Sequence, residues 1–124
     1  MQTATQTVNI LGTEYEIIFC EEGKTPELDG LGVDGCCYGF RKQILIYDLK
    51  KSKEWQNEPE ESVIKVSNKQ LRHEILHAFL NESGLDCNAY APVNNGWARN
   101  EEMVDWIAIQ FPKILKVYQE LDIL

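Results

Sequence analysis

The segment that most constrains this chain is His73-Glu74-Ile75-Leu76-His77, which contains the only two histidines among its 124 residues. Residues four apart lie on the same face of a helix, one turn from each other. Two imidazoles placed in this way can bind one zinc ion, and the intervening glutamate can act on a water molecule at that ion. Chance would produce this pattern from two histidines in roughly 0.2% of chains. The segment therefore predicts a helix that carries a metal site.

The residues around this motif predict the bounds of the helix. Ser67 and Gln70 have the spacing of a capping box, with Asn68 as an alternative cap, and Gly84 is expected to end the helix. Apolar residues cover most of the helix circumference: Leu71, Ile75, Leu76, Ala78, Phe79 and Leu80. A helix that is apolar on most sides is buried, and buried histidines need polar partners, which a metal ion would supply.

The chain before the motif has the pattern of a small β-sheet. Strands are predicted at residues 8–11, 15–20, 36–40 and 43–48. The first two flank a short turn that contains Gly12, which favours a β-hairpin. Residues 43–48 are apolar almost throughout, so we expect this strand to be central or covered on both faces.

The segments between these strands and the motif are expected to be irregular. Residues 21–35 contain four glycines and one proline and predict a loop, with at most one helical turn at 25–28. Residues 50–62 are charged and lack periodicity, which indicates an exposed connection. Residues 63–66 are expected either to form a short strand or to pack where the helix begins.

A second long helix is predicted from about Asn100 to the end of the chain, because its apolar residues keep helical spacing. Pro112 lacks a backbone N–H, so we expect a kink or a break near Phe111. The apolar residues Ile123 and Leu124 are expected to pack against the sheet. Together these elements predict one α+β domain over residues 1–124, with about four strands followed by the motif helix and a kinked C-terminal helix.

Composition excludes some classes of function. The net charge of −8 argues against sequence-independent binding to nucleic acid or to anionic lipid, since both require clustered basic residues. The first six residues are polar and no apolar run has membrane-spanning length, so we expect a cytoplasmic protein. Cys20, Cys36, Cys37 and Cys87 are then expected to be reduced thiols. The adjacent pair Cys36-Cys37 is interpreted as part of a small apolar strand, with a second metal or redox site as the alternative.

A catalytic zinc ion usually has three protein ligands and one position for water. Because both histidines are used, the third ligand must be a carboxylate or a cysteine. Glu101 and Glu102, at the start of the second helix, are the best candidates. They lie about 100° apart around the helix, so only one of them should face the metal. Spacing alone does not distinguish between them.

The combination of His-Glu-x-x-His with a later Asn100-Glu101-x-x-x-Asp105 resembles the zincin metallopeptidases of the gluzincin type. The chain is most similar to the very small zincins of phages and mobile elements of Gram-positive bacteria. The resemblance covers residues 70–108, and it implies that Glu101 is the third zinc ligand. It also implies that Asp105 supports a ligand histidine through the other N–H of the imidazole. Large gluzincins contain a second subdomain that supplies transition-state donors, and this chain has no room for one.

The expected activity is zinc-dependent hydrolysis of a peptide bond in a specific peptide or protein partner. One Zn²⁺ per chain, held by His73, His77 and Glu101, would activate water, and Glu74 would serve as the general base. An oxyanion donor is also required, and Arg99, Tyr90 and Tyr38 are candidates. The alternative function is a non-catalytic binding or regulatory module with a structural or latent zinc site.

Two further features of the sequence bear on substrate binding. The hairpin at residues 36–48 could present an edge strand that pairs with an extended peptide. Trp97 and Trp106 are expected to be packing aromatics rather than substrate contacts, since large aromatic side chains are usually buried.

Overall fold

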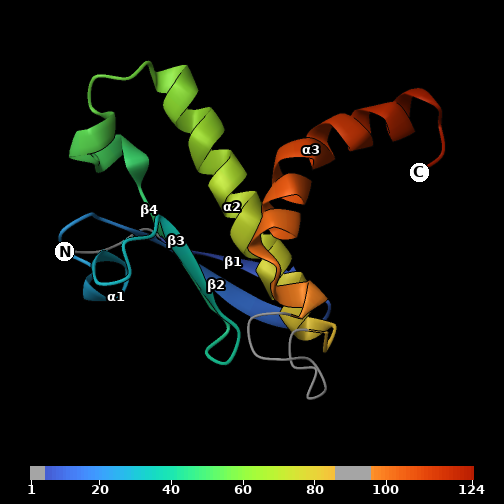
Figure 1. Cartoon of the computed structure of the whole chain (residues 1–124), viewed down its shortest axis with the longest axis horizontal. Coiled ribbons are helices and arrows are strands. Elements are labelled where there is room, and N and C mark those ends of the chain that lie inside the picture. Colours follow the sequence, from blue (N-terminus) through green and yellow to red (C-terminus); the bar gives the residue numbers. More distant parts are fainter. Residues whose placement is uncertain (1–4, 86–95) are drawn as a thin grey trace.

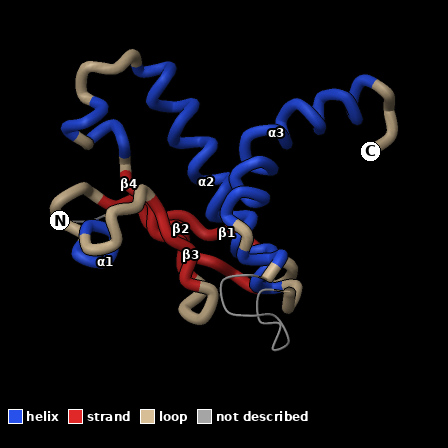
Figure 2. Tube along the Cα trace, viewed as in Figure 1, coloured by secondary structure: helices blue, strands red, loops and turns tan. Residues whose placement is uncertain are grey.

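The computed structural model describes residues 5–85 and 96–124, which form an α+β fold with a four-stranded mixed sheet. The strands are β1 (Thr5–Ile10), β2 (Thr13–Cys20), β3 (Gly35–Tyr38) and β4 (Gln43–Tyr47). The helices are α1 (Pro26–Asp29), α2 (Glu60–Glu82) and α3 (Glu101–Glu120). Short 3-10 turns occupy Leu49–Lys51 (η1), Lys53–Trp55 (η2) and Trp97–Arg99 (η3). Figure 1 and Figure 2 show α2 lying over the sheet and α3 beside α2.

The four predicted strands are all present, in the order β1-β2-β4-β3. β1 and β2 form the expected antiparallel hairpin, whose turn residues Leu11 and Gly12 have φ values of 50° and 93°. β4 pairs with β2 in parallel and with β3 in an antiparallel manner. Its central position explains its apolar sequence and confirms that prediction, while β3 lies at an edge of the sheet. The single helical turn expected in the first loop is α1.

The core lies between the sheet and α2. Ala78 of α2 is fully buried among residues of three strands, and Leu71 and Ile75 pack partly buried beside it. The buried strand residues in this cluster are Ile10, Tyr15, Ile17, Ile44 and Ile46. Phe79 is 39% exposed, so the expectation that α2 is covered on most sides is wrong. The sheet and α3 cover two sides of this helix, and solvent reaches the remainder.

The predicted start of the motif helix is also wrong. α2 begins at Glu60, with Pro59 as its N-cap, and Ser67 and Gln70 lie inside it. Glu60 and Glu61 in the first turn favour a helix N-terminus, because carboxylates interact well with its positive end. Val63 is 3% exposed and packs in a second cluster with Leu45 and Tyr47, which extends the helix beyond its local capping signal. The end of α2 is as predicted, with Gly84 at φ 82°.

α3 begins as predicted, since the Asn100 side chain accepts a hydrogen bond of 2.7 Å from the backbone N–H of Met103. The helix continues through Pro112, so the alternative of a break is wrong, and Figure 1 shows the ribbon changing direction along its length. Ile123 and Leu124 are 63% and 77% exposed, so their expected packing against the sheet is wrong as well. The far end of α3 points away from the sheet (Figure 1).

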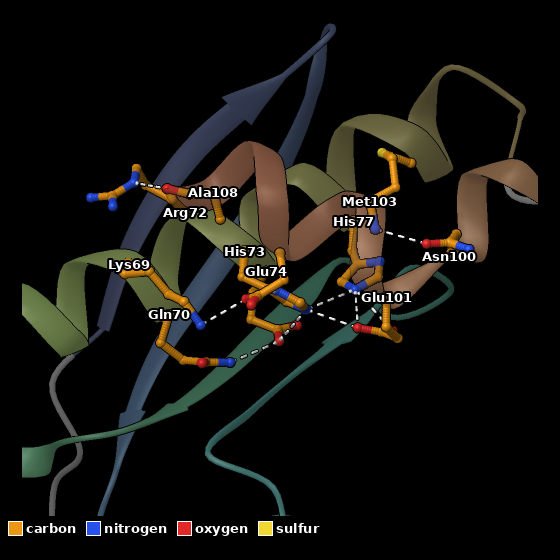
Figure 3. Close-up of polar contacts among 11 residues, drawn as sticks. Lys69, Gln70, Arg72, His73, Glu74, His77, Asn100, Glu101, Met103 and Ala108 are labelled. Carbon is orange, nitrogen blue, oxygen red and sulfur yellow. Dashed lines mark hydrogen bonds and ion pairs between the residues drawn. The ribbon is translucent and has the colours of Figure 1, made fainter. Parts of the chain in front are cut away.

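A side chain from α2 compensates for the proline in α3. Pro112 has no N–H to donate to the carbonyl oxygen of Ala108, four residues earlier. The Arg72 Nε donates a hydrogen bond of 2.7 Å to that oxygen (Figure 3). Because an unpaired carbonyl would be costly beside the packed helices, this bond lets Pro112 occupy the interior of the helix. It also ties α3 to the residue that precedes His73.

We expect Arg72→Met to lower the free energy of unfolding by about 1–2 kcal/mol, because it leaves the Ala108 carbonyl without its donor. In a Pro112→Ala background the restored N–H should reduce this cost by about 1 kcal/mol. Urea denaturation of the four proteins measures the coupling. Arg41→Met is the control, since Arg41 makes an exposed ion pair with Glu27 that should contribute little. An equal cost of Arg72→Met in both backgrounds would contradict the proposed compensation.

Within the described residues, no helix combines the length and the apolar character that crossing a membrane requires.

Candidate metal centre

The first two donors come from adjacent turns of α2. The Nε2 atoms of His73 and His77 lie 3.2 Å apart, and the two rings meet edge to face with centroids 4.9 Å apart. His73 is only 8% exposed, whereas His77 is partly exposed. The four-residue spacing has therefore brought both imidazoles to one point, as the sequence predicted.

The third donor comes from the start of α3. The Oε2 of Glu101 lies 2.9 Å from the Nε2 of His73 and 3.3 Å from the Nε2 of His77 (Figure 3). Ligands at about 2.0–2.1 Å from a tetrahedral zinc ion lie about 3.3 Å from one another. The three donor atoms are thus spaced as ligands of one such ion would be. No other group of three metal-binding side chains occurs in the described parts of the chain.

The structure distinguishes Glu101 from Glu102, the two candidates for the third donor that sequence spacing could not separate. Glu101 faces the histidines, and Glu102 lines a separate cleft. The choice follows from the way α3 is held. Its residues Val104 and Ala108 are fully buried, and the helix packs chiefly against α2. With those residues turned inward, the first turn presents Glu101 to the imidazoles.

Asp105 lies next to the other nitrogen of His73, with its Oδ1 3.1 Å from the Nδ1. The same oxygen lies 2.7 Å from the Nζ of Lys69. The pKa of Asp105 is lowered, first by its hydrogen bond to Lys69 and also by His73, so it is a carboxylate at neutral pH. The sequence did not single out Lys69 for this contact, although its position four residues before His73 places both on one face of α2.

Glu74 is buried next to the three convergent side chains but is not one of them. It is 4% exposed, and its Oε1 lies 3.9 Å from the Nε2 of His73. The Gln70 side chain donates a hydrogen bond of 3.3 Å to it (Figure 3). Burial raises the pKa of Glu74, and the two imidazoles partly oppose this shift. The carboxyl group is therefore better suited to hold a proton than an exposed glutamate would be.

The edge strand β3 passes close to Glu74. A Cβ on Gly35 would lie 3.2 Å from the Cγ of Glu74 and 3.3 Å from the carbonyl oxygen of Leu45. At the other end of the strand, a Cβ on Gly39 would lie 2.5 Å from the Asn81 side chain. These two glycines let the backbone of β3 approach α2 directly. The sequence placed Gly35 in a predicted loop and Gly39 inside the strand predicted at 36–40, and no local signal indicated this close approach.

A cleft of about 790 Å³ opens over these groups. It is lined by the following residues: Leu31, Val33, Gly35, Cys36, Cys37, Gly39, Gln70, His73, Glu74, His77, Asn81, Arg99 and Glu101. The wall opposite α2 is thus β3 and the residues that precede it. The candidate metal donors and the buried Glu74 share one accessible space with an edge strand.

The candidate oxyanion donors have different positions. Arg99 lines the cleft. Tyr38 is not among the described residues that line it, and the Arg41 guanidinium lies 3.8 Å from the centre of its ring. Tyr90 lies outside the described residues. Of the two candidates that the structure describes, Arg99 is the one that lies at the candidate site.

The described cysteines agree with the expectations from the sequence, whereas the tryptophans do not. Cys20, Cys36 and Cys37 are thiols rather than disulfides, as expected, while Cys87 lies outside the described residues. Cys36 and Cys37 lie in β3, in agreement with their interpretation as part of a small strand. Trp97 and Trp106 are 61% and 56% exposed, so the expectation that both are packing residues is wrong.

Comparison with known proteins adds no relative, because no family model, curated protein or solved structure matches this chain. The zincin resemblance remains a prediction from residues 70–108. What supports a metal centre is the convergence of His73, His77 and Glu101.

Proposed function

We propose that this protein is a zinc-dependent peptidase that acts on a specific peptide or protein partner. The observation that carries the proposal is the spacing of the three donor atoms of His73, His77 and Glu101, at 2.9–3.3 Å from one another. They lie at an accessible cleft beside the buried carboxyl group of Glu74. A metal donor set, a proton acceptor and room for a substrate occur together.

The chemistry of the donor set favours zinc. Two imidazole nitrogens and one carboxylate oxygen form a typical catalytic zinc site, which has three protein ligands. Structural zinc sites generally have four protein ligands, often cysteines. Neither Cys36 nor Cys37 belongs to the convergent group, although both line the cleft. This arrangement favours catalysis over the alternative of a structural site.

Zinc bound by these residues would polarise a carbonyl group and lower the pKa of water. Glu74 would take the proton from the attacking water and later deliver it to the leaving amine. Asp105 would accept the Nδ1–H of His73, which leaves the Nε2 lone pair directed at the ligand cluster. Lys69, paired with Asp105, holds that carboxylate in place. Arg99 is the proposed donor to the developing oxyanion.

The proposed substrate is an extended peptide. β3 pairs with β4 alone among the described strands, so its outer edge offers backbone groups for a further strand. An added strand would lie in the cleft whose walls carry Glu74 and the candidate zinc ligands. Gly35 and Gly39 add no side chain of their own to this wall.

The test is the metal content and the peptidase activity of the purified protein. We expect about one zinc ion per chain, together with cleavage in a peptide library that a chelator abolishes and added zinc restores. Copper or nickel replacing zinc in stoichiometric amount would contradict the choice of metal. Zinc without cleavage of any library peptide or protein would contradict catalysis and favour the non-catalytic module. Absence of any bound metal would overturn the proposal as a whole.

A further inference from the structure

A second cleft, of about 460 Å³, lies at the start of α3 and takes no part in the chemistry described above. Its lining consists of Trp97, Asn100, Glu102, Met103 and Trp106. Trp97 comes from η3, and the other residues come from the first turns of α3 and its cap. Glu102 and Trp106 are four residues apart, so they occupy one face of the helix.

The two tryptophans are the unusual feature of this cleft. Their exposures of 61% and 56% leave much of each indole in contact with water. Exposed large aromatics that gather around a hollow are typical of binding sites, whereas isolated ones need no explanation. The asparagine caps α3 and so has a structural role, but neither tryptophan is needed to fill the core.

The charge of the cleft indicates the kind of ligand. Among the described residues, Glu102 is the only ionisable one in its lining, and Arg99, although close in sequence, lines the cleft of the candidate metal centre instead. Indole faces attract cations through the negative potential of their π electrons, and a nearby carboxylate adds to that attraction. The whole chain carries a net charge of −8, which favours encounter with cationic partners.

We propose that this cleft binds the side chain of a lysine or arginine in the peptide substrate, and so makes the protein selective for basic peptides. The inference rests on the proposed peptidase function, since it names the substrate class of that site. Glu101 and Glu102 are consecutive, with one turned to the histidines and the next lining the aromatic cleft. The two clefts are therefore lined by consecutive residues of α3, and the proposed peptide would contact both.

The side chain of Met103 lies on the side of α3 that lines the aromatic cleft, as that of Glu102 does. Figure 3 shows its side chain directed away from Glu101 and the two histidines. Met103 lines the aromatic cleft, where its flexible thioether can follow the aliphatic part of a lysine or arginine side chain. The ligand that these groups suit has an apolar stem and a cationic end, which describes both basic side chains.

The test is a fluorescence titration of the metal-free protein, which separates peptide binding from zinc chemistry. A Trp55→Phe variant removes the only tryptophan outside the cleft, so that emission comes from Trp97 and Trp106. The probes are acetyl-Ala-Ala-X-Ala-Ala-amide peptides in which X is lysine, arginine, norleucine or glutamate. We expect saturable changes with lysine and arginine, and binding weaker by roughly tenfold with norleucine. Equal binding of the norleucine and lysine peptides would overturn the proposal.

Variants in the cleft give a second readout. Glu102→Gln should weaken the binding of the lysine peptide by roughly threefold, and Trp106→Ala by roughly tenfold. Glu120→Gln, the same change of charge farther along α3, should have no effect. Circular dichroism checks that each variant is folded, which we expect because the altered side chains are exposed. If Glu102→Gln and Glu120→Gln weakened binding equally, the effect would come from the net charge of the protein. That result would contradict a defined binding site.

A His77→Ala variant separates this inference from the peptidase proposal. Preference for the lysine peptide should survive His77→Ala, since the histidine does not line the aromatic cleft. If the wild-type protein cleaves peptides without preferring a basic residue near the cut, the peptidase proposal stands and the cation site is wrong. If basic peptides bind but no zinc-dependent cleavage is found, the cation site stands as a binding site and the peptidase proposal fails.

Discussion

Replacing Glu74 by glutamine is expected to lower kcat/KM for peptide cleavage by about 10²- to 10⁴-fold while leaving the bound zinc in place. The amide has nearly the shape of the carboxyl group but cannot accept the proton of the attacking water. Glu74 is not one of the three convergent donors, so metal content should not change. The measurement is the rate of hydrolysis of a library-derived peptide, with zinc quantified in the same samples.

Glu61→Gln serves as the matched control, because Glu61 is an exposed residue of the same helix whose ion pair with Lys65 lies in the first turn. It should retain full activity. Cleavage by Glu74→Gln at the parental rate would rule out Glu74 as the general base. A Glu74→Gln protein that had lost its zinc would instead assign Glu74 a role in binding the metal.

Glu101→Ala is expected to weaken zinc binding by more than about 100-fold, whereas Glu102→Ala should bind zinc as the parent does. Loss of a group that only supports a ligand typically costs 10- to 100-fold, and loss of a direct ligand should exceed that range. The two variants remove the same side chain from consecutive positions of α3, so their difference reports orientation alone. Competition with a chromophoric chelator measures both affinities.

His77→Ala should resemble Glu101→Ala in this assay, since both remove one of the three donors. Zinc retained with parental affinity in Glu101→Ala would exclude that residue as a ligand. If Glu102→Ala lost zinc in its place, the first turn of α3 would have to be oriented differently from the arrangement described above.

Local patterns were sufficient to predict the strands and the presence of the helix that carries the two histidines. The β1–β2 hairpin follows from two short apolar runs around Gly12, and the convergence of the two histidines follows from their four-residue spacing on a helix. The start of α2 could not be predicted in this way. The capping signal at Ser67 is local, but the burial of Val63 against Leu45 and Tyr47 depends on contacts between distant parts of the chain.

The candidate site shows the same division between local and long-range information. His73, Glu74 and His77 were identified from their own segment, whereas the resemblance to a known motif was needed to prefer Glu101. The contact of Lys69 with Asp105 depends on how α3 docks on α2. The exposure of Trp97 and Trp106 was predicted wrongly because aromatic residues are usually buried, and sequence pattern does not reveal when a cleft keeps them at the surface.

The docking of α3 has a consequence for how this protein would respond to metal. α3 packs chiefly against α2. The hydrogen bond from Arg72 to Ala108 and the contact of Glu101 with His73 both belong to this interface between the two helices. The two buried clusters of the described residues, which join the sheet to α2, include no residue of α3. Zinc bound by residues of both helices would therefore stabilise the docking of α3 on α2. Amide hydrogen exchange should then slow in α3 when zinc is added, while the exchange rate of the sheet stays unchanged.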